Sequence, residues 1–470
     1  MTNVVIIGGG PGGYEAALVA SQLGGSVTVV EKKGLGGSAV LTDVVPSKSL
    51  IAASEVMSKV RDAEELGLRP ASGAGTLFDA VTVDMCAVNQ RVRSLASAQS
   101  HDIAARMATE GIRVIDGLGR LDGTEAVIAT THEGAEERLP ADVTLVATGT
   151  RPRELPDAKP DGERILNWTQ MYDIDERPRR LIVVGSGVTG AEFASAYHNL
   201  GIEVVLVSSR THVLPSADDD AARVLQASFE GRGMTILSES RATAARRAGD
   251  GVVVSLADGR EVEGSHVLMA VGSIPNTEGI GLAEAGVALS KSGHIVVDKV
   301  SRTSARGVYA AGDCTGVFAL ASVAAMQGRI AMWHSLGDAV APLDLRTVSS
   351  NVFTAPEIAT VGVTQGEVDA GLVAARAIVM PLKSNARAKM QSLHEGFMKV
   401  FCLPTTGIVI GGVVVAPYAS ELIHPLSLAV ATKLTVDQVA QAFTVYPSLS
   451  GSIAEAARRL HTGGEEDEMY

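Results

Sequence analysis

The sequence predicts an α/β protein with two Rossmann-type dinucleotide-binding domains and a C-terminal α+β domain. Two glycine-rich segments support this, because each lies between a β-branched run and a helical pattern that leads to a second strand. The stretches from Gly8 to Glu31 and from Gly185 to Ser208 have the same length. A chain of 470 residues also exceeds one domain of roughly 100–200 residues.

The first glycine-rich segment belongs to a strand–helix–strand unit. A strand from Val4 to Ile7 leads into residues 8–13, a helix follows through Leu23, and a strand from Val27 to Val30 ends at Glu31. In such a unit the first glycine allows a tight turn, the second lets the backbone approach a pyrophosphate, and the third lets helix pack on strand. The helix N-terminus then binds the phosphates. The expected contact residues are Gly8, Gly10, Pro11, Gly12 and Gly13.

The second unit repeats this order. A strand from Leu181 to Val184 leads into residues 185–190, then come a helix through Leu200 and a strand from Val204 to Val207 that ends at Ser208. We therefore expect a second dinucleotide site. Its expected contact residues are Gly185, Gly187, Val188 and Gly190.

Strands that end at a glycine predict the domain boundaries. A strand from Thr144 to Ala147 ends at Thr148-Gly149, and the strand in 268–271 ends in the same way at Gly272. Residues 153–180, rich in proline and charge, are expected to be a linker. The predicted domains are a discontinuous first unit of 1–150 and 271–344, a second unit of 151–270, and a C-terminal unit of 345–470.

The later elements follow from similar signals. A strand up to Asp313 is expected to deliver this acid to a helix over about 319–336. Strands over 377–382 and 397–401, then helices from Ala419, predict the α+β unit. The acidic residues 465–468 are expected to form a solvated tail.

Composition excludes several classes of partner. The net charge of −13 disfavours nucleic acid and anionic membranes, because both are polyanions. The most apolar stretch, 408–416, is far shorter than the roughly 20 residues that span a bilayer. The chain opens without a basic and apolar leader, so we expect a cytoplasmic enzyme with a small diffusible substrate. Cys86, Cys314 and Cys402 have no metal-site or redox-pair spacing, which predicts inert free thiols and no metal site.

The chain resembles the flavoprotein disulfide reductases, a family that includes lipoamide dehydrogenase. The resemblance covers essentially the whole chain and rests on both glycine-rich units and on the segments 147–149, 270–272 and 309–313. Residues 352–357, followed by Val361-Gly362, resemble the family's dimerisation domain. The resemblance implies a homodimer, the commonest form of oligomer.

The resemblance also implies FAD at the first unit and a nicotinamide coenzyme at the second. Glu31 would bind the adenosine ribose, Asp313 the ribityl chain or pyrophosphate, and Gly119 the adenine. The alternative for Asp313 is a simple turn residue before a helix. Further implied cofactor-binding residues are Gly36, Gly37, Lys48, Thr148, Gly149, Gly272 and Ala321.

Two parts of the family's chemistry are missing. Its disulfide motif corresponds to residues 36–48, where Ala39 and Val44 replace both cysteines. Its histidine and glutamate near the C-terminus are replaced by Tyr446 and Gly451. We therefore expect no disulfide reductase or lipoamide dehydrogenase activity. Tyr446 would donate a proton or stack on a flat substrate, and packing at the dimer interface is an equal alternative.

The hydride-transfer residues are kept. By resemblance, Lys48 would lie beside flavin N5, and Glu192 would pair with it near the nicotinamide. The alternative is a solvated lysine and a glutamate on a helix surface. At the end of the second unit's last strand, Ser208, Ser209 and Arg210 replace the acid that selects NAD, which favours NADPH while allowing NADH.

These residues predict an NAD(P)H dehydrogenase whose electrons pass directly to a small acceptor, most plausibly a quinone. Within the family, the chain looks most like the NAD(P)H:quinone reductases of mycobacteria that lack the disulfide. A soluble pyridine nucleotide transhydrogenase is one alternative, although such relatives typically keep one motif cysteine. The other is a non-enzymatic FAD-binding redox sensor, against which Lys48 and Glu192 argue.

Overall fold

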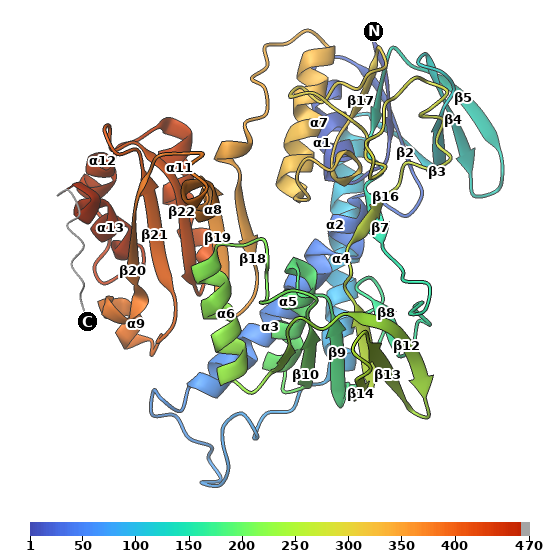
Figure 1. The fold of residues 1–470 in the computed structure, drawn as a ribbon. Coiled ribbons are helices and arrows are strands. Elements are labelled where there is room, and N and C mark those ends of the chain that lie inside the picture. Colours follow the sequence, from blue (N-terminus) through green and yellow to red (C-terminus); the bar gives the residue numbers. More distant parts are fainter. Residues whose placement is uncertain (462–470) are drawn as a thin grey trace.

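The structure is a computed structural model that describes residues 1–461. It has the multi-sheet α/β architecture that the sequence predicts, with three units around separate sheets (Figure 1). The predicted acidic tail, 465–468, lies outside the described residues. Within them, no helix is both long and apolar enough to cross a membrane.

The first unit is built on a seven-stranded sheet in the order β17-β6-β1-β2-β3-β4-β5. The first five strands of this order are parallel, and β4 and β5 join them antiparallel. Helices α1 and α7 lie side by side on one face (Figure 1). The elements are β1 (Asn3–Ile7), α1 (Pro11–Gln22), β2 (Ser26–Glu31), α4 (Met85–Thr109), β3 (Arg113–Leu121), β4 (Ala126–Thr131), β5 (Glu136–Pro140), β6 (Val143–Val146), β17 (Val308–Ala310), η1 (Asp313–Thr315) and α7 (Ala321–Ser335).

The second unit has a five-stranded parallel sheet in the order β11-β10-β9-β15-β8, covered by the three-stranded sheet β12-β13-β14. The order β10-β9-β15 repeats β2-β1-β6, as expected for two units of one design. The elements are β8 (Ile165–Asn167), β9 (Arg180–Val184), α5 (Val188–Asn199), β10 (Glu203–Val207), α6 (Asp219–Gly231), β11 (Thr235–Leu237), β12 (Ala242–Ala248), β13 (Gly251–Leu256), β14 (Glu261–Gly264) and β15 (His266–Met269).

The prediction of a linker over 153–180 is wrong. This segment contains β8, which pairs with β15, and it buries Trp168, Met171, Tyr172 and Ile174 in a core. Its prolines and charges lie at its two ends, and the apolar residues between them take part in the second sheet. The connections between the two units are instead β7 (Thr150–Pro152) and β16 (Ser273–Pro275), which pair with each other.

Helix α3 (Val44–Asp62) connects all three units, after the short helix α2 (Gly37–Leu41). Its buried residues Leu50, Ile51 and Met57 share one core with α5 and with the C-terminal sheet. Lys48 on α3 is thereby held against α5, which carries Glu192.

The C-terminal unit is an antiparallel sheet in the order β18-β19-β22-β21-β20, with several short helices packed on it (Figure 1). Its elements are η2 (Leu345–Thr347), β18 (Ser349–Val352), β19 (Glu357–Gly362), α8 (Gln365–Asp369), β20 (Arg376–Pro381), η3 (Leu382–Ser384), α9 (Ala386–Met390), β21 (Phe397–Cys402), β22 (Val409–Ala416), α10 (Ala419–Leu422), α11 (His424–Thr432), α12 (Val436–Gln441) and α13 (Gly451–His461).

Candidate functional site

The first glycine-rich loop packs too closely on its neighbours to carry side chains at two points. Gly8 has φ +106°, and a Cβ there would lie 2.2 Å from the carbonyl oxygen of Ala147. A Cβ on Gly13 would lie 1.9 Å from the carbonyl oxygen of Gly8. At Gly10, by contrast, the nearest atom to an added Cβ is Gly37 Cα at 4.0 Å. The second glycine therefore leaves space beside the backbone.

The second loop repeats this geometry. A Cβ on Gly185, which has φ +112°, would lie 2.2 Å from the carbonyl oxygen of Ala270, and one on Gly190 would lie 1.8 Å from the carbonyl oxygen of Gly185. Nothing lies within 4 Å of a Cβ added to Gly187. Val188, half exposed, begins α5 beside this space.

Both helices that follow these loops have N-termini suited to an anion. Gly10 caps α1 and Gly187 caps α5, and neither makes a side-chain cap hydrogen bond. Neither first turn carries an acidic residue. Free N–H groups and the positive end of the helix dipole attract phosphate, so the residues present fit one dinucleotide at each loop.

Glu31 lies at the end of β2, beside the first loop. Its Oε2 accepts a hydrogen bond of 2.6 Å from the N–H of Gly9, and its Oε1 accepts one of 2.7 Å from the N–H of Lys33. A carboxylate has about four lone-pair sites, so it can still accept from a ribose diol. Gly36 and Gly37 lie at the start of α2, where Gly37 packs on Gly10.

Asp313 begins η1, and Thr150 Oγ1 approaches its Oδ2 at 3.5 Å. Burial raises the pKa of Asp313. Thr148 Oγ1 donates to the carbonyl oxygen of Asn276 at 2.7 Å, which ties the 147–149 turn to the segment after Gly272.

Three residues that are predicted to contact FAD through their backbone lie in a turn, at a helix start and inside a strand. Gly149 has φ +63° in the turn after β6, and Ala321 is the first residue of α7. Gly119 lies inside β3, where a Cβ would come within 2.9 Å of Ile7 Cγ2. Close packing thus accounts for Gly119, and its contact with adenine stays a prediction.

Lys48 and Glu192 form an ion pair, with Lys48 Nζ donating to Glu192 Oε2 at 2.7 Å. The Glu192 side chain is 5% exposed and that of Lys48 is 27% exposed. Glu192 Oε1 also accepts from the N–H of Phe353 at 2.9 Å, and Lys48 Nζ lies 4.8 Å from the centre of the Phe353 ring. The solvated lysine and surface glutamate of the alternative reading are therefore wrong. Sequence reasoning missed Phe353, because a backbone donor leaves no sequence signal.

Asp43 is a second residue that sequence reasoning missed. It lies between α2 and α3, one position before Val44, in the segment that resembles the disulfide motif. Burial raises the pKa of Asp43 to about 6; Glu192 and Asp313 add to this increase, and Lys48 opposes it. The signal was an aspartate next to a position that a cysteine occupies in the family.

Neither position of the missing disulfide can accept electrons. Ala39 lies in α2 and Val44 begins α3. Cys314 is the cysteine next to Asp313, and burial raises its thiol pKa to about 11, so it is inert near neutral pH.

The residues at the end of β10 differ in accessibility. Ser208 is fully buried, and its hydroxyl lies 2.7 Å from Ser186 Oγ and accepts from the N–H of Arg210 at 3.1 Å. Ser209 and Arg210 are exposed. Of the three predicted phosphate contacts, these two have accessible side chains.

Tyr446 is not brought to Lys48 and Glu192 within the described chain. It is 85% exposed, near Phe443 and Val445, which are also exposed.

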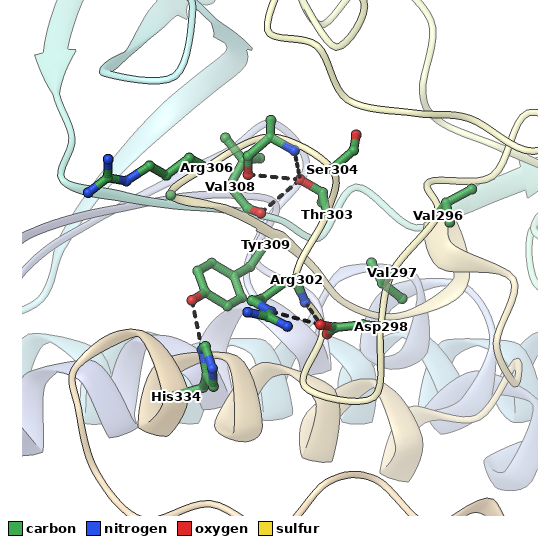
Figure 2. A pocket seen from close by; sticks show the side chains of 12 residues that line it. Val296, Val297, Asp298, Arg302, Thr303, Ser304, Arg306, Val308, Tyr309 and His334 are labelled. Carbon is green, nitrogen blue, oxygen red and sulfur yellow. Dashed lines mark hydrogen bonds and ion pairs between the residues drawn. The ribbon is translucent and has the colours of Figure 1, made fainter.

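A separate cavity of about 670 Å³ lies at the β17 edge of the first sheet and contains none of the predicted site residues (Figure 2). Several of its polar side chains are paired with one another or with the backbone: Tyr309 Oη with His334 Nδ1 at 2.9 Å, Arg302 with Asp298 at 2.7 Å, and Thr303 Oγ1 with the carbonyl of Val308 at 2.8 Å. We assign no chemistry to it. Among residues 1–461, no group of three or more His, Cys, Asp or Glu side chains could hold a metal ion.

Residues 2–328 match the family described as pyridine nucleotide-disulphide oxidoreductase, and residues 348–457 match its dimerisation domain. The chain is 54% identical to the NAD(P)H dehydrogenase (quinone) of Mycobacterium tuberculosis, over 98% of this chain and 94% of that protein. It is 31% identical to a dihydrolipoyl dehydrogenase of Zymomonas mobilis, over 98% and 99% of the two chains.

Among solved structures, the chain is similar to LpdA from Mycobacterium tuberculosis. The TM-score is 0.92 at 53% identity, covering 98% of this chain and 100% of LpdA. The flavoprotein disulfide reductase RclA from Escherichia coli shares the fold, with a TM-score of 0.85 at 21% identity over 97% and 99% of the two chains.

Proposed function

Because the chain belongs to the pyridine nucleotide-disulphide oxidoreductase family, we propose that it is a flavoprotein NAD(P)H dehydrogenase that reduces a quinone. The observation that carries this proposal is the ion pair between Lys48 and the buried Glu192, kept while Ala39 and Val44 replace the disulfide. Disulfide exchange requires an attacking thiolate, whereas a quinone requires none. In this proposal the residues for hydride transfer from NAD(P)H are kept, and the electron acceptor is a molecule other than a disulfide.

Membership of the family implies the use of FAD and NAD(P)H. Bound FAD would supply the redox chemistry, namely hydride acceptance from the nicotinamide and electron delivery to the acceptor. We propose that the unit of 1–150 and 271–344 binds FAD, that 151–270 binds NAD(P)H, and that 345–470 forms the dimer interface. The glycine-rich loops, Glu31 and Asp313 would hold the first cofactor.

The residues of the chain supply position and charge. The Lys48 ammonium would attract electron density toward the flavin, and Glu192 offsets the cost of burying that cation. The N–H of Phe353 fixes the other carboxylate oxygen, so Glu192 keeps one orientation. The pair thus provides a preset cation beside the place where hydride transfer occurs.

We further propose a preference for NADPH and a homodimer. Arg210, exposed at the end of β10, can form a bidentate pair with a 2′-phosphate, and no acid ends this strand. In a homodimer, Tyr446 would reach the partner's site, as the resemblance implies.

An acceptor panel tests the proposal. The purified FAD-bound protein should oxidise NADPH rapidly with benzoquinones and naphthoquinones and have negligible activity with lipoamide or glutathione disulfide. Lipoamide turnover as fast as naphthoquinone turnover would overturn the proposal. Hydride transfer to a nicotinamide analogue exceeding quinone reduction would instead favour a transhydrogenase, and no bleaching of the flavin by NADPH would favour a redox sensor.

A further inference from the structure

We propose that the side-chain carboxyl group of Asp43 donates the proton that the quinone takes up during its reduction. The inference rests on the proposed quinone reduction and adds a catalytic residue to it. Asp43 is not among the residues that the resemblance assigns. The family's histidine and glutamate are missing, and Tyr446, which replaces the histidine, is 85% exposed and does not reach Lys48 and Glu192 within the described chain.

The backbone fixes Asp43 between α2 and α3, the helix that carries Lys48. Its N–H donates to the carbonyl oxygen of Ser38 at 2.8 Å, and its own carbonyl oxygen accepts from the N–H of Ser47 at 2.7 Å. The residue is therefore held at the start of α3, five positions before Lys48. It occupies the N-cap position of α3, yet its side chain does not cap that helix.

The carboxyl group of Asp43 makes no hydrogen bond within the described residues, and the residue is partly buried. The other acids of the site differ. Glu192 is held by Lys48 and Phe353, and Glu31 is held by two backbone N–H groups. An aspartate at an N-cap normally accepts from the first turn, so a free carboxyl there is available to another partner.

The charged groups around Asp43 come from three elements: Lys48 on α3, Glu192 on α5 and Asp313 on η1. Burial holds the pKa of the Tyr172 phenol well above its usual value, and the Asp43 carboxyl raises that pKa further. Burial raises the pKa of Asp43 to about 6, so the carboxyl is protonated in a useful fraction of molecules near neutral pH. Tyr172 is a far weaker acid in this setting.

The proton balance requires such a donor. NADPH, one proton and a quinone yield NADP⁺ and a hydroquinone. The hydride supplies both electrons and one hydrogen nucleus, so a second proton must reach a quinone oxygen as its C=O double bond becomes a C–OH single bond. Asp43 gives up this proton and becomes a carboxylate, and solvent then returns it.

The experiment compares two acceptors in the FAD-bound protein. Ferricyanide accepts electrons without protons, whereas naphthoquinone needs both. We expect Asp43→Asn to lower kcat/KM for naphthoquinone about a hundredfold and to leave kcat/KM for ferricyanide within about twofold. Asp62→Asn is the matched control, because Asp62 is also a carboxyl of α3 with a pKa raised by burial, at the far end of the helix. It should change neither rate.

The pH dependence and an infrared measurement complete the test. In the unaltered protein, kcat/KM for naphthoquinone should fall as pH rises through about 6, because the donor form is lost, and Asp43→Asn should lack this fall. The infrared carboxylic acid band should lose intensity over the same pH range and be weaker in Asp43→Asn, whether or not turnover occurs. Asp43→Glu, which keeps an acid, should retain part of the naphthoquinone rate.

Three outcomes separate the inference from the proposed function. If the unaltered protein reduces no quinone, the proposed function fails. If it does, and Asp43→Asn keeps the same rate and pH profile, the inference alone is wrong. Equal losses with naphthoquinone and ferricyanide would also overturn it, since they would mean a general effect on the site and not proton donation.

Discussion

Arg210 is the cation on which the proposed preference for NADPH rests. Its N–H is bonded to Ser208 and its carbonyl oxygen to the N–H of Glu239, so the loop is held while the exposed side chain is free to reach a ligand. A charge-assisted hydrogen bond contributes roughly 1.5–3 kcal/mol. Arg210→Ala should therefore raise Kd for NADPH about ten- to a hundredfold and leave NADH almost unchanged.

Isothermal titration calorimetry measures the Kd of Arg210→Ala for NADPH and for NADH and so checks this prediction. Arg246→Ala is the control, because Arg246 is another exposed arginine of the same unit, paired with Glu261. If both coenzymes weaken equally in Arg210→Ala, Arg210 does not bind the 2′-phosphate.

Single residues also show the limit of sequence reasoning. The motif located Ser208 at the end of its strand, but its hydroxyl turns inward to Ser186. Lys48 and Glu192 were paired by resemblance, and the structure gives the same pair, at 2.7 Å. Asp43 and Phe353 were missed, because a motif marks where a residue lies and not where an unusual side chain or a backbone N–H points.

His266 makes the stability of the second unit depend on pH. It is 3% exposed, and burial, with Arg164 and Arg247, lowers its pKa to about 4. An unfolded histidine takes up a proton near its usual pKa of 6.5, while the folded one does so only near 4. The contribution of neutral His266 to the free energy of unfolding is therefore fully present above about pH 6.5. It is lost as the pH drops toward 4, by up to about 3 kcal/mol.

Urea unfolding at several pH values measures this effect. His266→Gln removes the titrating group, so its unfolding midpoint should fall less between pH about 7 and pH about 5 than that of the unaltered protein. Parallel pH profiles for the two proteins would show that His266 is not the source.

At the scale of elements, hydrophobic periodicity predicted strands and helices correctly, whereas proline and charge content predicted a linker that is wrong. The predicted strands and helices of both glycine-rich units match β1, α1, β9 and α5 to within a residue or two. The short strand β8 was taken for linker, because three residues between charged stretches show no period, and its pairing with β15 is a long-range contact.

Two ion pairs made by Lys399 join the C-terminal unit to the second unit. Lys399 on β21 is 1% exposed and bonds Asp218, which is 3% exposed, and Asp220, at 2.8 and 2.7 Å. Replacing it by methionine leaves the buried Asp218 charge unpaired, which costs about 3–5 kcal/mol. Lys399→Met should therefore lower the unfolding midpoint clearly.

The double variant Lys399→Met with Asp218→Asn isolates the cause. Asparagine keeps the N-cap of α6 that Asp218 provides and removes its charge, so the double variant should recover most of the lost stability. Calorimetry of the four proteins gives the coupling. Additive losses would mean that the charge pair is not what links the two units.

At the scale of the whole molecule, the C-terminal unit presents an apolar segment before α13. Phe443 is 107% exposed, Val445 is 78% exposed and Tyr446 is 85% exposed, although all three lie within four positions. Monomeric proteins rarely expose a contiguous apolar patch of this kind. Together with the match to the dimerisation domain, this supports the proposed homodimer.

Charge on this segment should therefore break the dimer. Burying a side chain such as Phe443 or Val445 contributes roughly 1.5–3 kcal/mol, and a twofold interface buries each side chain twice. Phe443→Asp with Val445→Asp should weaken dimerisation at least about a thousandfold, which sedimentation velocity would detect as monomers. Leu372→Asp is the control, since Leu372 is 74% exposed in the same unit but lies outside the segment. If both variants stay dimeric, the interface lies elsewhere, and Tyr446 cannot serve the partner's site by this route.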